Sequence, residues 1–170
     1  MPSKKQILDL LWNRPYIIGH WIGFKDLTEL HNVWLRSFLY SDTDRTLLAH
    51  RGSYKTSTLS LFLAIHLVIN PNENVMFFRK TDSDVTEVIK QTAKILDSGC
   101  MRQIVRVLYG KELVFIKCTD SEIHTNLCTS IKGASQIVGL GIGTSITGKH
   151  ADIVVTDDIL NLKDRISRAE

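Results

Sequence analysis

The fold is decided by the stretch Thr46-Leu-Leu-Ala-His-Arg-Gly-Ser-Tyr-Lys-Thr-Ser57 and by the residues that follow it. Its first four residues, Thr46–Ala49, form an apolar run that predicts a short buried strand. The rest of the stretch is polar and contains one glycine. From Thr58 to Ile69 the apolar residues recur at helical spacing, which predicts a core-facing helix that stops at Asn70-Pro71.

Further strands and helices are expected on both sides of this stretch. A helix is predicted over Asp26–Leu39, with Asp26 and Glu29 as a capping pair, and residues 1–24 are expected to form an N-terminal extension. Thr81-x-x-Asp84 predicts the capped start of a helix that ends at Gly99. Its apolar face consists of Val85, Val88, Ile89, Ile95 and Leu96.

Four more apolar runs predict strands. They are Val75–Phe78, Leu113–Ile116 with Ile123–Leu127 as a hairpin, Gln136–Leu140 and Ile153–Thr156. Strands that alternate with amphipathic helices are typical of an α/β sheet with helices on both faces. In such a sheet ligands bind beyond the carboxyl ends of the strands, where the chain's polar clusters are expected to lie.

Composition limits the classes of protein to which the chain can belong. With 170 residues, 44% hydrophobic and 23% charged, it is long enough for one domain with a buried core and is not a disordered or low-complexity segment. No apolar run approaches the roughly 18 residues that would cross a bilayer, and no signal peptide is recognisable. Cys100, Cys118 and Cys128 are expected to be reduced thiols in the cytoplasm. A net charge of +3 permits a nucleic-acid partner without indicating one.

Two segments partly satisfy the pattern of a phosphate-binding loop, which needs a strand, a tight turn, a helix start, a Lys and a Ser or Thr. Gly143–Lys149 fits GxxxxGK, but His150 follows the lysine and the next residues are typical of a strand. We therefore expect a flexible loop there. Gly52-Ser-Tyr-Lys-Thr56 has a predicted strand before it and a predicted helix after it.

The second segment departs from the full phosphate-loop pattern at two positions. Ala49 and Tyr54 stand where glycines are usual, and a bulky residue at position 54 resists a positive φ. A polar connection with a solvated lysine is therefore the alternative interpretation of this segment.

Two neighbouring carboxylates, Asp157 and Asp158, follow the predicted strand Ile153–Thr156. At such a strand end one carboxylate can order a metal ion while the second orients and deprotonates a water. The two aspartates can divide these tasks only if the chain turns there, because successive strand residues point to opposite faces. The alternative is that Asp158 caps a helix beginning at Ile159–Leu162.

The segment His50–Thr56 resembles the deviant Walker A motif of the large terminase subunits of tailed bacteriophages, in which an Arg stands four residues before the Lys. Ile153–Asp158 resembles the Walker B motif of that family. Leu30–Trp34 and Phe78–Thr81 match less specifically, and the resemblance covers about residues 25 to 165. It implies a P-loop NTPase-type, mostly parallel sheet that is incomplete at its C-terminal end.

The resemblance also implies a role for each matching residue. Lys55 would hold the β- and γ-phosphates of ATP, Thr56 would ligate Mg²⁺, and Asp157 would hold the ion through water. Arg51 would stabilise the γ-phosphate and Asp158 would be the catalytic carboxylate, a position that is commonly Glu in the family. The nucleotide-binding set is Gly52, Ser53, Tyr54, Lys55, Thr56 and Ser57. Arg79 and Lys80 could contact DNA phosphates or form a solvated strand end.

The implied function is that of the ATPase domain of a viral DNA-packaging motor, with ATP and Mg²⁺ as cofactors. Expected partners are double-stranded DNA, the small terminase subunit and the portal protein, with assembly into a homo-oligomer only within the motor. We expect a single, truncated domain over residues 1–170, without the family's nuclease domain and without nuclease activity, in the cytoplasm of a bacterial host. The alternatives are a helicase- or recombination-type P-loop ATPase, and a prophage remnant without turnover.

Overall fold

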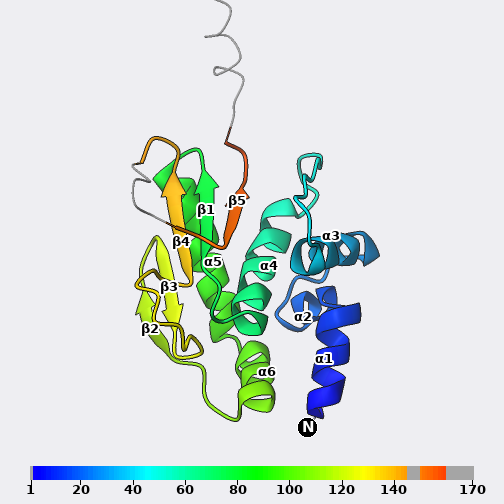
Figure 1. Cartoon of the computed structure of the whole chain (residues 1–170). Coiled ribbons are helices and arrows are strands. Elements are labelled where there is room, and N and C mark those ends of the chain that lie inside the picture. Colours follow the sequence, from blue (N-terminus) through cyan, green and yellow to red (C-terminus); the bar gives the residue numbers. More distant parts are fainter. Residues whose placement is uncertain (1, 145–149, 160–170) are drawn as a thin grey trace, which may run out of the picture. The chain divides into compact units, whose positions relative to one another are not determined.

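A computed structural model describes residues 2–144 and 150–159 (Figure 1). The chain forms two compact units. Within the described residues, the first unit comprises residues 2–70 and 91–114, and the second comprises residues 71–90, 115–144 and 150–159. No helix in the described part of the chain is both long enough and apolar enough to cross a membrane.

The first unit is helical. Its helices are α1 (Lys4–Asn13), α2 (Tyr16–Trp21), α3 (Glu29–Tyr40), α4 (Lys55–Ile69), the end of α5 (Asp82–Asp97) and α6 (Gly99–Tyr109). Helix α4 is buried from Thr58 to Val68, so it forms the core of this unit, and α3 packs against it. Helices α1 and α6 also pack together.

The N-terminal part of the chain is helical. Residues 1–24, expected as an extension, contain α1 and α2, and α1 begins with a capping box between Ser3 and Gln6. The predicted capping pair of Asp26 with Glu29 is wrong. Helix α3 begins after Thr28, whose backbone N–H donates to His31 Nδ1 at 2.8 Å, and this local partner fixes the start of the helix.

The predicted strand Thr46–Ala49 is not formed. These residues have no regular secondary structure, and the side chain of Leu48 is 92% exposed. A strand is stable only when a neighbouring strand satisfies its backbone N–H and C=O groups. Among the described residues no strand pairs with this segment, because the sheet consists of β1 to β5 only.

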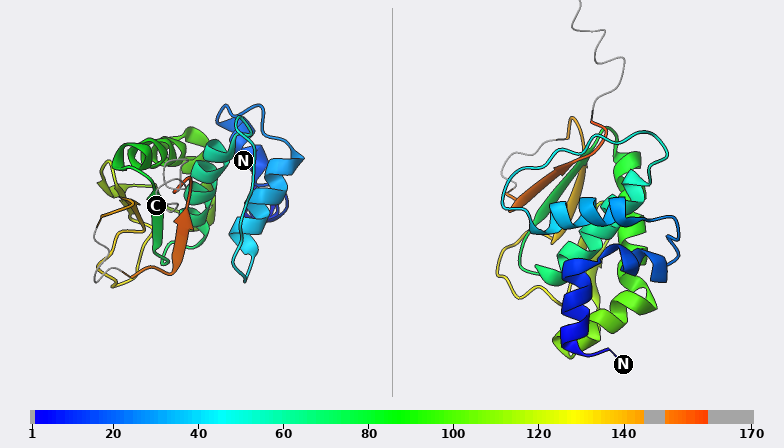
Figure 2. Two further views of the ribbon diagram at one scale, coloured as in Figure 1. Left: turned by 90° about the horizontal axis from the view of Figure 1, so that it is seen from above. Right: turned by 90° about the vertical axis from the view of Figure 1, so that its right-hand side faces the viewer.

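The second unit contains one five-stranded sheet. Its strands are β1 (Val75–Arg79), β2 (Phe115–Cys118), β3 (Glu122–Thr125), β4 (Ile137–Gly141) and β5 (Ile153–Thr156). The order is β2-β3-β4-β1-β5, so β2 and β5 are the edges (Figures 1 and 2). Strand β1 pairs in parallel with β4 and β5, whereas β3 pairs antiparallel with β2 and β4. The α/β class is confirmed, and the described sheet is mixed where a mostly parallel one was predicted.

The start of α5 packs on one face of this sheet. Thr81 Oγ1 accepts a hydrogen bond from the backbone N–H of Asp84, which confirms the predicted cap. The five residues predicted as the apolar face of this helix are all buried. At Gly139 on β4, a Cβ atom would lie 2.3 Å from Val85 Cγ1, so the strand approaches the helix too closely for a larger residue.

Candidate functional site

The predicted phosphate loop, residues 50–57, leads directly into helix α4. Ser53 closes the turn, because its backbone N–H and its hydroxyl both donate to the carbonyl oxygen of His50, at 3.4 and 2.7 Å. Gly52 has φ +83, a conformation that glycine adopts without strain. Lys55 is then the first residue of the helix.

Tyr54 adopts the left-handed conformation, although a bulky residue resists a positive φ. Its φ and ψ are 54° and 24°. Such a conformation costs a non-glycine residue roughly 1–2 kcal/mol, so the surrounding contacts must hold it. The Tyr54 hydroxyl donates to Asp26 Oδ2 at 2.7 Å, and the Tyr54 carbonyl accepts from the N–H of Thr58 at 2.9 Å. The hydrogen bond to Asp26 also raises the pKa of the Tyr54 phenol.

Helix α4 presents an electropositive end to this loop. Its N-cap, Tyr54, makes no side-chain capping hydrogen bond, and its first turn contains no acidic residue. The first turn instead contains Lys55, Thr56 and Ser57. A helix N-terminus already carries about half a positive charge, so this end of the 15-residue helix favours an anion.

The predicted metal-ordering residue, Asp157, follows β5 in the second unit. Its backbone N–H donates to the carbonyl of Phe78 at 2.9 Å, which extends the pairing between β5 and β1 by one residue. The Asp157 side chain is 6% exposed and forms an ion pair with Arg79, Nη2 to Oδ2, at 3.1 Å. Arg79 Nη1 donates to the carbonyl oxygen of Asp84 at 3.2 Å, so the guanidinium joins β1, α5 and the end of β5.

Asp158 has φ +45 and its side chain is exposed. The chain therefore turns at this residue, as the division of roles between Asp157 and Asp158 requires. The alternative helix at Ile159–Leu162 and the charged residues 161–170 lie outside the described residues, apart from Ile159. Residues 145–149 of the rejected GxxxxGK segment also lie outside them.

The structure thus separates the predicted site residues into two groups. Arg51 to Ser57 are contiguous in the first unit, at the start of α4. Arg79, Lys80, Asp157 and Asp158 belong to the second unit, at the carboxyl ends of β1 and β5. The described residues contain no group of three or more His, Cys, Asp or Glu side chains that could hold a metal ion.

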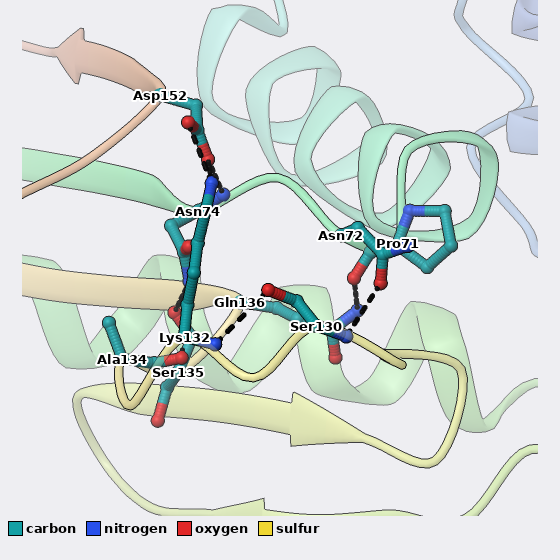
Figure 3. Close-up of polar contacts among 9 residues, drawn as sticks. All are labelled: Pro71, Asn72, Asn74, Ser130, Lys132, Ala134, Ser135, Gln136 and Asp152. Atoms are coloured by element: carbon teal, nitrogen blue, oxygen red, sulfur yellow. Dashed lines mark hydrogen bonds and ion pairs between the residues drawn. The ribbon is translucent and has the colours of Figure 1, made fainter.

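A second polar cluster lies at the opposite ends of the same strands, where the loop 129–136 crosses the amino ends of β1, β4 and β5 (Figure 3). Asn74 Nδ2 donates to the carbonyl oxygens of Ala134 and Ser135, and the Asn74 N–H donates to Asp152 Oδ2. Lys132 Nζ pairs with both oxygens of Asp152, at 2.7 and 2.9 Å. The hydrogen bond from Lys132, together with the one from the backbone N–H of Asn74, lowers the pKa of Asp152.

The loop 129–136 also borders a pocket of about 770 Å³ in the second unit. Apolar side chains from three strands line it, and Lys117, Lys132 and Glu122 are among its charged residues. Each lysine has a carboxylate partner, since Lys117 Nζ lies 2.8 Å from Glu122 Oε2 and Lys132 pairs with Asp152. Both lysines that line the pocket are therefore engaged in ion pairs.

The comparisons with known proteins identify no relative: no family model, no curated protein and no solved structure matches the chain.

Sequence reasoning missed one residue beside the phosphate-loop candidate. His31 on α3 is buried, and its Nε2 lies 3.1 Å from the carbonyl oxygen of Ser53. Thr28-x-x-His31 has the spacing of a capping box, which was the only local signal for this residue. Its contact with Ser53 spans 22 positions in the sequence and has no local signature.

Proposed function

We propose that this chain binds Mg-ATP through residues 50–57 and serves as the ATPase part of a viral DNA-packaging motor. The observation that carries the proposal is the start of α4. There a tight turn with two left-handed residues, Gly52 and Tyr54, leads into a long helix whose first turn holds Lys55 and Thr56 and no acidic residue. Backbone N–H groups, a helix N-terminus and an ammonium group together favour a polyphosphate.

The proposed roles follow from the chemistry of each side chain. Lys55 neutralises the β- and γ-phosphates, and the Thr56 hydroxyl ligates Mg²⁺, which needs few protein ligands because phosphate oxygens and waters supply the rest. Arg51, which is exposed, stabilises charge on the γ-phosphate. Asp157 orders the ion through water, and Asp158 accepts a proton from the attacking water. Double-stranded DNA is the substrate that the proposed motor moves.

Isothermal titration of the whole chain with Mg-ATP tests the proposal. We expect binding by the wild type and by Lys149→Ala, and loss of binding in Lys55→Ala. Circular dichroism and thermal unfolding of each variant show that it is folded. Binding that survives Lys55→Ala, or that disappears only in Lys149→Ala, would show that residues 50–57 are not the nucleotide site.

A second candidate function is nucleotide binding without turnover. It is favoured by the segment Thr46–Ala49, which is not a strand and therefore does not anchor the loop from its N-terminal side. Phosphate release with and without double-stranded DNA separates the two candidates. Turnover that falls at least tenfold in Asp158→Asn supports the motor ATPase, and tight binding with no phosphate release supports the second candidate.

A further inference from the structure

We infer that His31 is a positioning residue for nucleotide binding, because it fixes the orientation of the Ser53–Tyr54 peptide in the 50–57 loop. This inference rests on the proposed function of that loop. Helix α3 would then do more than pack against α4. Through His31 it would hold the Ser53–Tyr54 peptide in an orientation that can bind an anion.

The hydrogen bonds of His31 define which of its ring nitrogens carries the proton. The backbone N–H of Thr28 can only donate, so Nδ1, at 2.8 Å from it, must be the acceptor. The neutral imidazole then carries its proton on Nε2. Nε2 therefore donates to the Ser53 carbonyl oxygen, at 3.1 Å.

This donation determines where the next N–H points. In a trans peptide the C=O and N–H groups point in opposite directions. Because the Ser53 carbonyl is directed at His31 on α3, the Tyr54 N–H is directed away from α3. It is the last backbone donor before Lys55, and it is the kind of donor that forms an anion-binding concavity at a helix start.

Two further contacts make His31 a firm support. His31 is 6% exposed, and its ring contacts those of Trp34 and Tyr54, with centroids 5.0 and 6.3 Å away. On the other side of the strained residue, the Tyr54 hydroxyl donates to Asp26. The left-handed Tyr54 is thus held through the preceding carbonyl and through its own side chain.

An asparagine at position 31 separates the capping role of His31 from this positioning role. Its amide oxygen lies at about the same distance from the backbone as Nδ1 of the imidazole, so His31→Asn can still accept from the Thr28 N–H. Asparagine has no atom at the position of Nε2, so its shorter side chain does not reach Ser53. The matched control is Thr28→Ala, which weakens the cap of α3 and leaves the bond between His31 and Ser53 in place.

The test measures Mg-ATP affinity by titration and backbone order by ¹⁵N relaxation, on the full chain. We expect His31→Asn to weaken binding by about three- to tenfold, the usual worth of one hydrogen bond, and to lower the order parameters of Ser53 and Tyr54. Thr28→Ala should lower the thermal unfolding midpoint while its affinity stays within twofold of the wild type.

The outcomes distinguish this inference from the proposed function. If Lys55→Ala abolishes binding while His31→Asn binds as the wild type does, His31 is only a helix cap and the inference is overturned. If Thr28→Ala weakens binding as much as His31→Asn does, the effect comes from the stability of α3, which also overturns it. If the wild type binds no Mg-ATP, the proposed function fails, and unchanged order at Ser53 in His31→Asn would then reject the positioning role too.

Discussion

Arg79 Nη2 lies 3.1 Å from Asp157 Oδ2, and the two side chains are 11% and 6% exposed. The pair joins the carboxyl ends of two neighbouring parallel strands, β1 and β5. A buried charge that loses its partner is costly, because desolvation is no longer offset by attraction. Arg79 therefore fixes the carboxylate that we propose as the metal-ordering group.

Asp157→Asn should lower the free energy of unfolding by about 3 kcal/mol, since it removes the buried charge partner of Arg79 and leaves, among the described residues, only the exposed Glu87 carboxylate, 3.9 Å from Nη1. Urea unfolding measures this. The chain offers a control at nearly the same distance, because Lys90 Nζ lies 3.0 Å from Asp120 Oδ1 with both side chains more than half exposed. Asp120→Asn should cost less than about 1 kcal/mol. Equal losses in the two variants would show that burial does not govern the Arg79 pair.

Tyr54→Gly should be more stable than Tyr54→Ala by about 1 kcal/mol. Both variants lack the ring and the hydroxyl bond to Asp26, so they differ mainly in the backbone. Glycine adopts φ 54 without the steric penalty that alanine pays. Chemical denaturation of the two variants gives the difference directly. A more stable alanine variant would mean that residue 54 is not left-handed in solution.

Local patterns predicted much of the fold. The end of α4, the cap and apolar face of α5, and strands β1, β4 and β5 were predicted within a few residues, because periodicity, caps and strand runs are properties of adjacent residues. Helix α6 was not predicted, although it has similar local signals: Ser98 is its N-cap and Gly110 is its C-cap. A capping box marked α1 in the same way.

Apart from the cap of α3, the wrong predictions concern contacts between residues far apart in the chain. Thr46–Ala49 has the composition of a strand, yet a strand needs a partner that composition does not reveal. Likewise Lys55 and Asp157 could be proposed from motifs, whereas the bonds from His31 to Ser53 and from Arg79 to Asp157 span 22 and 78 positions. Such pairs depend on tertiary packing, so a single sequence does not predict them.

His66 should make the protein sensitive to mild acid. It is buried in α4, and burial lowers its pKa from 6.5 to about 4. Between these values the unfolded chain takes up a proton that the folded chain excludes, so the free energy of unfolding falls as pH drops from 6.5 towards 4. The full difference corresponds to roughly 3 kcal/mol.

Urea unfolding at several pH values compares the wild type with His66→Gln, which cannot be protonated in this range. The gap between the two stabilities should narrow on acidification, as only the wild type loses this contribution. The carboxylates titrate in both proteins, so their contributions cancel in the difference between the two unfolding free energies. Parallel pH profiles would mean that His66 is accessible to protons in the folded state.

Asn74→Ala should destabilise the protein by about 1–3 kcal/mol, because it removes the donor for the carbonyls of Ala134 and Ser135 beneath the loop 129–136. The hydrogen bond from its backbone N–H to Asp152 can remain. Lys132→Met removes an exposed pair with Asp152 from the same loop and should cost less than about 1 kcal/mol. Thermal unfolding ranks the two, and the reverse order would show that the exposed lysine holds the loop.

Helix α5 lies close to the sheet at Gly139. A Cβ there would lie 2.3 Å from Val85 Cγ1 and 3.2 Å from Ile89 Cγ1, and Val85 is 1% exposed. Gly139→Ala should therefore destabilise the protein by about 1–3 kcal/mol through overpacking. Gly133→Ala is the matched control, since an added Cβ there meets no atom within 4 Å, and it should be neutral or slightly stabilising.

The pair Gly139→Ala with Val85→Ala makes the test specific. Val85→Ala alone creates a cavity and destabilises, but it also removes the methyl group that an alanine at 139 would strike. The double variant should therefore be more stable than the sum of the two single losses predicts, by about 1 kcal/mol or more. Additive losses in urea unfolding would mean that Val85 and Gly139 are not in contact, and that α5 does not pack on this face of β4.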